Sequence, residues 1–180
     1  MRPEPGQVLH FSENPSITWF EPHVAPTATL RDPLVWAVDA ARSPGYWFPR
    51  ECPRAMAWAR PGTAAADRDV ILGPGGGDRV HAIEYGWLEA LRTVRLFAYR
   101  LPAASFVPLG EPEPHALVSA EPVEPLGSAE PVGSLFQLHE EAGIQLRVLP
   151  RLWPFWDAVI ASSLGYSGIR LRNARPRPAP

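Results

Sequence analysis

The chain has 180 residues, of which 46% are hydrophobic and 20% charged, with a formal net charge of −2. This length suits one domain with a sizeable core, for which seven tryptophans and seven phenylalanines supply bulky anchors. The near-neutral charge argues against non-specific nucleic-acid binding, which rests on a basic surface.

Three absent features indicate where the protein resides: an internal disulfide, a membrane-spanning segment and a signal peptide. A single cysteine, Cys52, excludes an internal disulfide. No run approaches the roughly 20 apolar residues of a membrane-spanning helix, and the N-terminus lacks the apolar core of a signal peptide. We therefore expect a cytoplasmic protein that does not enter a membrane. The five histidines and Cys52 show no metal-ligand spacing, so no metal is predicted.

Short apolar runs predict strands along the first two thirds of the chain. These are expected over residues 8–11, 34–38, 55–59, 79–84, 95–101 and 116–119. One helical turn is expected over 39–43, capped by Asp39, and a short helix over 87–91. A glycine run over 73–77 lacks the spacing of a phosphate-binding loop and is interpreted as a flexible loop.

A pentapeptide recurs in the C-terminal third, as Ser119–Val123 and Ser128–Val132. The second copy predicts a helix start, with Ser128 near the cap and Pro131 in the first turn, and an end at Gly143. A strand over 144–149, an aromatic-rich helix over 152–164 and a strand over 169–172 are expected to follow.

Short strands dominate, and no regular alternation of strands and helices is visible. This pattern predicts an α+β fold with a small mixed or antiparallel sheet and two or three helices, mainly towards the C-terminus. We expect a single globular domain over residues 1–173 and a disordered tail, rich in proline and arginine, over 174–180.

Residues 46–54 carry three aromatics, two arginines and two prolines. The prolines keep this segment from being helical, and arginine both binds phosphate or carboxylate groups and stacks on rings. Two interpretations stay open. One is a site for an anionic, base-bearing ligand such as a dinucleotide, formed by Tyr46, Trp47, Arg50 and Arg54. The other is a loop at the edge of the core with surface arginines.

Three further residues are candidates on chemical grounds. His10 lies on the first predicted strand, where a half-buried structural histidine is the default interpretation. Glu84 ends a strand and Glu121 follows Ser119, and either could act as a general base if the fold brings it to a cleft.

Nearly the whole chain resembles an uncharacterised bacterial family of unknown function. The matching stretches are residues 9–12, 35–37, 46–54, 119–123, 149–154 and 169–173. This resemblance implies no known activity.

A more remote resemblance is to ADP-ribosyltransferase-like folds. Leu9–Ser12 is similar to an early strand of the rifampin ADP-ribosyltransferases, and Ser119–Val123 to their Arg-Glu-Pro-Leu strand. Tyr46–Pro53 is similar to a segment that lies beside the nicotinamide dinucleotide in DarT-type enzymes. The resemblance implies an ADP-ribosyltransferase-like core with NAD as co-substrate.

Carried over by position, the resemblance assigns roles to single residues. His10 would hold the nicotinamide-side ribose and Arg50 the phosphates, while Tyr46 or Trp47 would flank the nicotinamide. Glu121 or Glu84 would stabilise the oxocarbenium-like centre or activate the acceptor.

The sequence thus leaves two functional hypotheses. The first is an NAD- or nucleotide-binding protein, as an ADP-ribosyltransferase or NAD glycohydrolase, with a small-molecule nucleotide as ligand. The alternative is a non-enzymatic domain that binds a protein or small ligand through the aromatic–arginine surface of Tyr46–Arg54, because interfaces favour arginine, tryptophan and tyrosine.

Overall fold

The computed structural model describes residues 2–24, 32–110 and 114–177, which form two compact units. Unit 1 comprises Met1–Phe48 and Val94–Gly133, and unit 2 comprises Pro49–Thr93 and Ser134–Pro180. The chain therefore leaves unit 1 after Phe48, returns to it at Val94, and ends in unit 2. The expectation of one domain over residues 1–173 stays a prediction.

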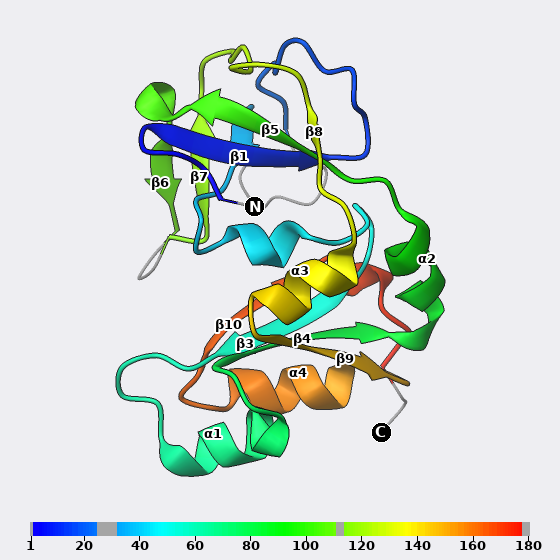
Figure 1. Cartoon of the computed structure of the whole chain (residues 1–180). Coiled ribbons are helices and arrows are strands. Elements are labelled where there is room, and N and C mark those ends of the chain that lie inside the picture. The colour runs from blue at the N-terminus through cyan, green and yellow to red at the C-terminus, as the bar shows by residue number, and fades with distance from the viewer. Residues whose placement is uncertain (1, 25–31, 111–113, 178–180) are drawn as a thin grey trace. The chain divides into compact units, whose positions relative to one another are not determined.

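Unit 1 is built from two three-stranded antiparallel sheets (Figure 1). The first has the order β1 (Gln7–Ser12), β5 (Phe97–Pro102), β8 (Glu130–Pro131), and the second the order β2 (Val35–Ala37), β7 (Ala116–Ser119), β6 (Val107–Leu109). Short 3₁₀ turns lie at Ser43–Tyr46 and Ala103–Ser105.

The core of unit 1 follows the period-two pattern of its strands. Phe97, Tyr99 and Leu101 alternate along β5 and are buried together with Val8 and residues of the second sheet. The Tyr99 hydroxyl donates to the carbonyl of Asn14 at 2.7 Å, so its polar end is satisfied inside the core.

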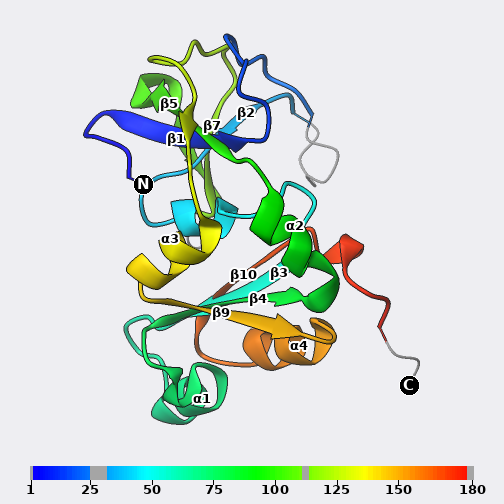
Figure 2. The same cartoon turned by 45° about the vertical axis from the view of Figure 1, so that its right-hand side comes forward.

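Unit 2 has one four-stranded sheet with helices on both faces. The sheet order is β10 (Gly165–Ile169), β3 (Arg54–Trp58), β4 (Arg79–Glu84), β9 (Ile144–Leu149). Only the β4–β9 pair is parallel. Helix α3 (Leu135–Glu141) lies on one face, and α1 (Ala65–Ile71) and α4 (Trp153–Ile160) lie on the other, as Figures 1 and 2 both show. Helix α2 (Leu88–Thr93) and 3₁₀ turns at Gly73–Gly75, Tyr85–Trp87 and Leu171–Asn173 complete the unit.

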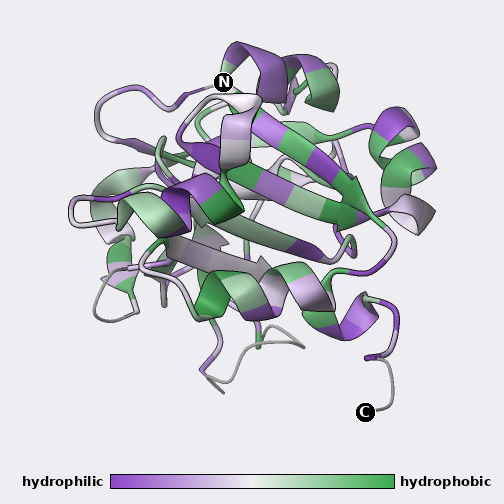
Figure 3. Cartoon of the chain, turned by 90° about the horizontal axis from the view of Figure 1, so that it is seen from below, coloured by the Kyte–Doolittle hydropathy of each residue, from purple (hydrophilic) through white to green (hydrophobic). Residues whose placement is uncertain are grey.

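The two faces of the unit 2 sheet carry different side chains. Ala57 and Val80 pack against Val159 of α4. Directly opposed residues of antiparallel strands share a face, and Met56 opposes His81. Because side chains alternate along a strand, Met56 and His81 point to the face covered by α3. Figure 3 shows that hydrophilic and hydrophobic residues are mixed along the strands and helices.

The α+β class is confirmed, with four α-helices among the described residues. The expected strands over 8–11, 34–38, 55–59, 79–84, 95–101, 116–119 and 144–149 all correspond to observed strands. The region of 39–43 forms a turn in which Asp39 accepts from the N–H of Arg42 at 2.9 Å, and the 3₁₀ helix begins at Ser43.

The predicted helix start at Ser128 is wrong. Glu130 and Pro131 form β8 and pair with β5, and α3 begins at Leu135. Ser134 is the actual N-cap, and its side chain accepts from the N–H of Gln137 at 3.3 Å.

The C-terminal region also differs from expectation. Helix α4 ends at Ile160, where the sequence predicted an extension to residue 164. The last strand spans Gly165–Ile169, and a 3₁₀ turn over Leu171–Asn173 occupies the second half of the expected 169–172 strand. Within the described residues, every helix is too short or too polar to cross a bilayer.

Candidate functional site

The residues predicted to form a dinucleotide site belong to both units. His10, Tyr46, Trp47 and Glu121 lie in unit 1, and Arg50, Arg54 and Glu84 lie in unit 2.

The aromatic part of the 46–54 segment is buried. Trp47 is 4% exposed and Phe48 is 2% exposed, so both rings belong to the interior. Tyr46 is half-buried, and the exposed residues of the segment are Arg50 and Glu51. This segment therefore offers charge to a ligand, whereas its tryptophan and phenylalanine faces serve the core.

Arg54 and Cys52 are buried neighbours in unit 2. The Arg54 guanidinium donates to the Cys52 carbonyl at 3.0 Å. Burial raises the pKa of the Cys52 thiol to about 12, with the charge of Arg54 opposing this change and that of Glu84 reinforcing it. A thiol held protonated in this way is a structural residue and a poor nucleophile.

Arg50 belongs to what we call the arginine cluster: Arg50, Glu51, Arg170, Arg172 and Asn173, all in unit 2. Asn173 donates to the Glu51 carboxylate at 2.9 Å, and the guanidinium groups of Arg170 and Arg172 approach the same carboxylate to 3.5 and 3.8 Å. The Arg170 Nε also donates to the carbonyl of Arg50 at 3.2 Å. Residues about 120 positions apart are thus joined at one place.

The electrostatics of the arginine cluster favour an anion. The hydrogen bond from Asn173, followed by the charges of Arg170, Arg172 and Arg50, lowers the pKa of Glu51. Three guanidinium groups act on one carboxylate, which leaves the cluster with a formal charge of +2. Arginine's planar fork is suited to carboxylate and phosphate oxygens.

Arg170 has an uncommon backbone conformation. It is the only non-glycine residue with a positive φ (55°) among the described residues, and a left-handed conformation costs on the order of 1 kcal/mol or more for an ordinary side chain. It lies immediately after β10, where the chain turns into the Leu171–Asn173 3₁₀ helix. This turn places both Arg170 and Arg172 beside Glu51.

Glu84, predicted as a catalytic carboxylate, is 2% exposed and held by backbone N–H groups. One carboxylate oxygen accepts from the N–H of Leu152 at 3.0 Å, and the other accepts from the N–H of Arg175 at 2.9 Å. Leu152 is the N-cap residue of α4. Both oxygens of Glu84 thus hold the start of a helix and the C-terminal segment.

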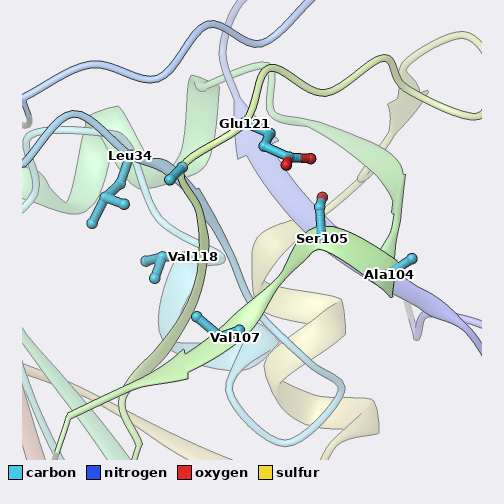
Figure 4. Close-up of a pocket in the computed structure, with 7 residues that line it drawn as sticks. Leu34, Ala104, Ser105, Val107, Val118 and Glu121 are labelled. Carbon is cyan, nitrogen blue, oxygen red and sulfur yellow. The ribbon is translucent and has the colours of Figure 1, made fainter.

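Glu121 lines an open hollow of about 490 Å³ within unit 1. Figure 4 shows its carboxylate and the Ser105 hydroxyl pointing toward one another, while Leu34, Val107 and Val118 form the apolar side. The backbone of Glu121 is fixed by a turn in which its N–H donates to the Ser119 hydroxyl at 3.1 Å. The side chain itself is exposed.

His10 is half-buried on β1. Its Nδ1 lies 2.7 Å from the carbonyl of Trp36, so Nδ1 carries a proton and donates. The ring also packs on Phe20, with 4.8 Å between ring centroids. These contacts match the structural interpretation of this histidine and tie β1 to β2.

Comparison with known proteins assigns the chain to a family. A model of a family of unknown function, DUF6886, matches residues 9–174. The chain belongs to DUF6886. The match covers the predicted site residues and the whole arginine cluster, so both lie within the DUF6886 domain. The curated proteins gave no match, and the solved structures gave none. The resemblance to ADP-ribosyltransferases therefore has no support from these comparisons.

Sequence reasoning missed part of the DUF6886 arginine cluster. Arg170, Arg172 and Asn173 were noted only within a matching stretch and a predicted strand, since nothing near them in sequence marks a site. His81 and His139, which contact each other inside unit 2, were also missed because they are 58 residues apart. Among the described residues, no group of three or more histidine, cysteine, aspartate or glutamate side chains is placed to hold a metal ion.

Proposed function

We propose that this DUF6886 protein binds an anionic ligand of the nucleotide class, with NAD as a candidate, at the arginine cluster of unit 2. The observation that carries the proposal is the approach of the Arg170 and Arg172 guanidinium groups to the single carboxylate of Glu51, on which the charge of Arg50 also acts. A diphosphate offers two adjacent anionic groups, each able to accept paired hydrogen bonds from an arginine.

Glu51 supports this proposal by its chemistry. Its carboxylate is the kind of group that the cluster would bind from a ligand, and it is already held by Asn173 and two arginines. An incoming phosphate would compete with this internal carboxylate for the same donors. Because the cluster is largely exposed, its attraction is screened by salt, and we expect the affinity to fall as ionic strength rises.

The proposal concerns binding. Of the two carboxylates predicted to be catalytic, Glu84 is used by the backbone N–H groups of Leu152 and Arg175. Glu121 is exposed on unit 1, which does not contain the arginine cluster.

The test is a thermal-shift and calorimetric titration with NAD, ADP-ribose, ADP and pyrophosphate. A ligand that binds the native state raises the unfolding midpoint by mass action. We expect the shift in the wild-type protein to be lost in Arg50→Gln and Arg172→Gln. Arg92→Gln is the matched control, because Arg92 is also an exposed arginine of unit 2 but is paired with Glu89 at 2.7 Å.

A second variant gives an effect of opposite sign. Glu51→Gln removes the internal competitor and raises the formal charge of the cluster from +2 to +3, so binding should tighten. Glu121→Gln serves to detect a ligand bound instead in the hollow of unit 1. Absence of any shift with all four compounds, or an equal loss in Arg92→Gln, would overturn the proposal.

A further inference from the structure

Two histidines of unit 2 are buried in contact with each other. His81 on β4 is fully buried, and His139 on α3 is 2% exposed. The Nδ1 of His81 lies 3.0 Å from the Nε2 of His139, and the rings meet edge to face with 5.1 Å between centroids. This contact joins the sheet to the helix that covers it.

The hydrogen bonds at both ends fix the direction of this contact. Arg79 has only donors, and its Nε donates to the Nε2 of His81 at 2.9 Å. His139 at the other end has its Nδ1 2.7 Å from the carbonyl of Leu135, which can only accept. His81 must therefore donate through Nδ1 to His139, which donates onward through its own Nδ1. Both histidines are neutral, and each carries its proton on Nδ1.

An additional proton would break this chain. On His81 it would place an N–H against the N–H of Arg79, and on His139 an N–H against that of His81. Burial, followed by the charge of Arg79, the charge that His139 carries when protonated, and the charge of Arg54, lowers the pKa of His81 well below its usual value. Burial and the charge of Arg79 lower the pKa of His139, against the opposing effect of the Leu135 carbonyl.

The charged groups on the strands and helices around His81 and His139 do not oppose the lowering of these pKa values. Arg54 on β3 and Arg79 on β4 are both cationic. The acids of α3, Glu140 and Glu141, are exposed, and on α2 the acid Glu89 is exposed and bound to Arg92.

We propose that the Arg79–His81–His139 chain is a proton-sensitive latch, in which protonation of either histidine at mildly acidic pH releases α3 from the sheet of unit 2. The latch lies within one unit and is independent of any ligand at the arginine cluster. The driving force comes from linkage: a released histidine takes up a proton near its ordinary pKa of about 6.5, whereas the latched one does not. Latching is therefore complete well above pH 6.5 and weakens as pH falls below it.

The expected change in the opening equilibrium follows from how strongly the released histidines are protonated. At pH 5.5 each released histidine is about ten times more often protonated than not, so each shifts the opening equilibrium by up to about tenfold. For the pair, the opening equilibrium rises by up to about a hundredfold relative to pH 7.5.

The test is amide hydrogen exchange of the full chain at pH 7.5 and pH 5.5, corrected for the intrinsic rates. Amides that close the turns of α3, such as those of Leu138 and of the C-cap residue Ala142, should lose up to about a hundredfold of protection, and amides of the β1–β5 pair in unit 1 should lose less. A pH-independent α3, or an equal loss in both units, would overturn the latch.

Substitutions show whether the pH dependence of α3 comes from this histidine pair or from other titratable groups. His139→Gln keeps an acceptor for His81 but cannot be protonated, so the pH dependence at α3 should fall by up to about tenfold. His23→Gln, at an exposed histidine of unit 1, should leave it unchanged. If His139→Gln does not fold, nitrogen NMR of the wild-type protein decides: the latch requires both rings to be neutral and protonated on Nδ1 at pH 7.5, and any other state overturns it.

Discussion

Glu84 receives the backbone N–H of Leu152 on one carboxylate oxygen, at 3.0 Å, inside unit 2. The acceptor comes from the end of β4, and the donor is the N-cap residue of α4. A charged acceptor at the start of a helix satisfies an otherwise unpaired donor and interacts favourably with the helix dipole. Glu84 thus links the sheet to the helix that covers one of its faces.

This relationship makes Glu84 a stability residue. Glu84→Ala leaves the buried N–H of Leu152 and the N–H of Arg175 without their acceptor, so we expect the free energy of unfolding to fall by about 2–5 kcal/mol. Glu84→Gln keeps one acceptor oxygen but turns an amide N–H toward the other donor, and should cost about 1–3 kcal/mol.

The measurement is urea unfolding of both variants, beside Glu89→Ala as the control for an exposed glutamate of the same unit. Glu89→Ala should change stability little. An equal, small change in all three variants would show that the two backbone contacts of Glu84 do not matter to stability.

Local sequence signals predicted the strands well, since each depends on residues within one short run. The strand over 79–84 has the predicted bounds, because its alternating pattern reflects one face against α4 and one against α3. The start of α3 failed for a tertiary reason. Pro131 looks like a first-turn proline, but it pairs with Phe97, 34 residues earlier in the chain.

The candidate site was predictable only in part. Arg50 was identifiable because aromatics and prolines surround it in sequence. Arg170 and Arg172 join it because β10 pairs with β3, which sets Ile169 opposite Arg54. The sequence of either strand alone does not predict this pairing. The burial of Trp47 was equally hidden, because a dense aromatic run is compatible with a surface or a core.

The pentapeptide repeat has a structural explanation that its sequence did not reveal. Each copy ends on a buried valine that bonds to a neighbouring segment: Val123 exchanges backbone hydrogen bonds with Phe20, and the N–H of Val132 donates to Leu96. Each copy therefore joins its own segment to another segment of unit 1 by backbone hydrogen bonds.

The capping role of Ser134 can be tested by comparing it with Ser128, the helix start that the sequence predicted. Ser134→Ala removes the acceptor for the N–H of Gln137 and should lower the free energy of unfolding by about 1 kcal/mol. Ser134→Asp should retain stability, because an aspartate also caps and favours the helix N-terminus. Ser128→Ala is the control and should be nearly neutral. A larger loss in Ser128→Ala than in Ser134→Ala, measured by urea unfolding, would contradict the assigned helix start.

Cys52 should be inert in the folded protein. With its pKa raised to about 12, the thiolate fraction at pH 8 is on the order of a thousandfold smaller than for an ordinary thiol. Reaction with a chromogenic disulfide reagent at pH 8 should be at least about 100-fold slower in native protein than in urea. Equal rates would show an accessible thiol.

The same thiol predicts a loss of stability at alkaline pH. Its folded pKa lies above its unfolded value, so the unfolded chain releases the proton first, and stability falls as pH rises from about 9 towards 12. The slope contributed by one group is at most about 1.4 kcal/mol per pH unit. Unfolding of the wild-type protein and of Cys52→Ala at pH 8 and pH 10.5 isolates this contribution, because the alanine variant lacks it. Parallel pH profiles for the two proteins would rule out a raised thiol pKa.

The C-terminal segment predicted to be disordered makes specific contacts up to its last described residue. The N–H of Arg175 donates to buried Glu84, and the carbonyl of Arg175 accepts from the indole of Trp153 at 2.6 Å. The Arg177 guanidinium lies 4.3 Å from the centre of the Trp153 ring and binds both oxygens of Asp157. Residues 178–180 lie outside the described residues.

These contacts distinguish two truncations. A chain ending at Asn173 loses the donor to one oxygen of Glu84, and its free energy of unfolding should fall by about 1–3 kcal/mol. A chain ending at Arg177 keeps every contact described above and should match the full-length protein within about 0.5 kcal/mol. Urea unfolding followed by tryptophan fluorescence suits the comparison, because Trp153 is itself a contact of the segment. If both truncated chains are as stable as the full-length protein, residues 174–177 contribute nothing to folding, and the sequence-based expectation of a disordered tail holds from residue 174.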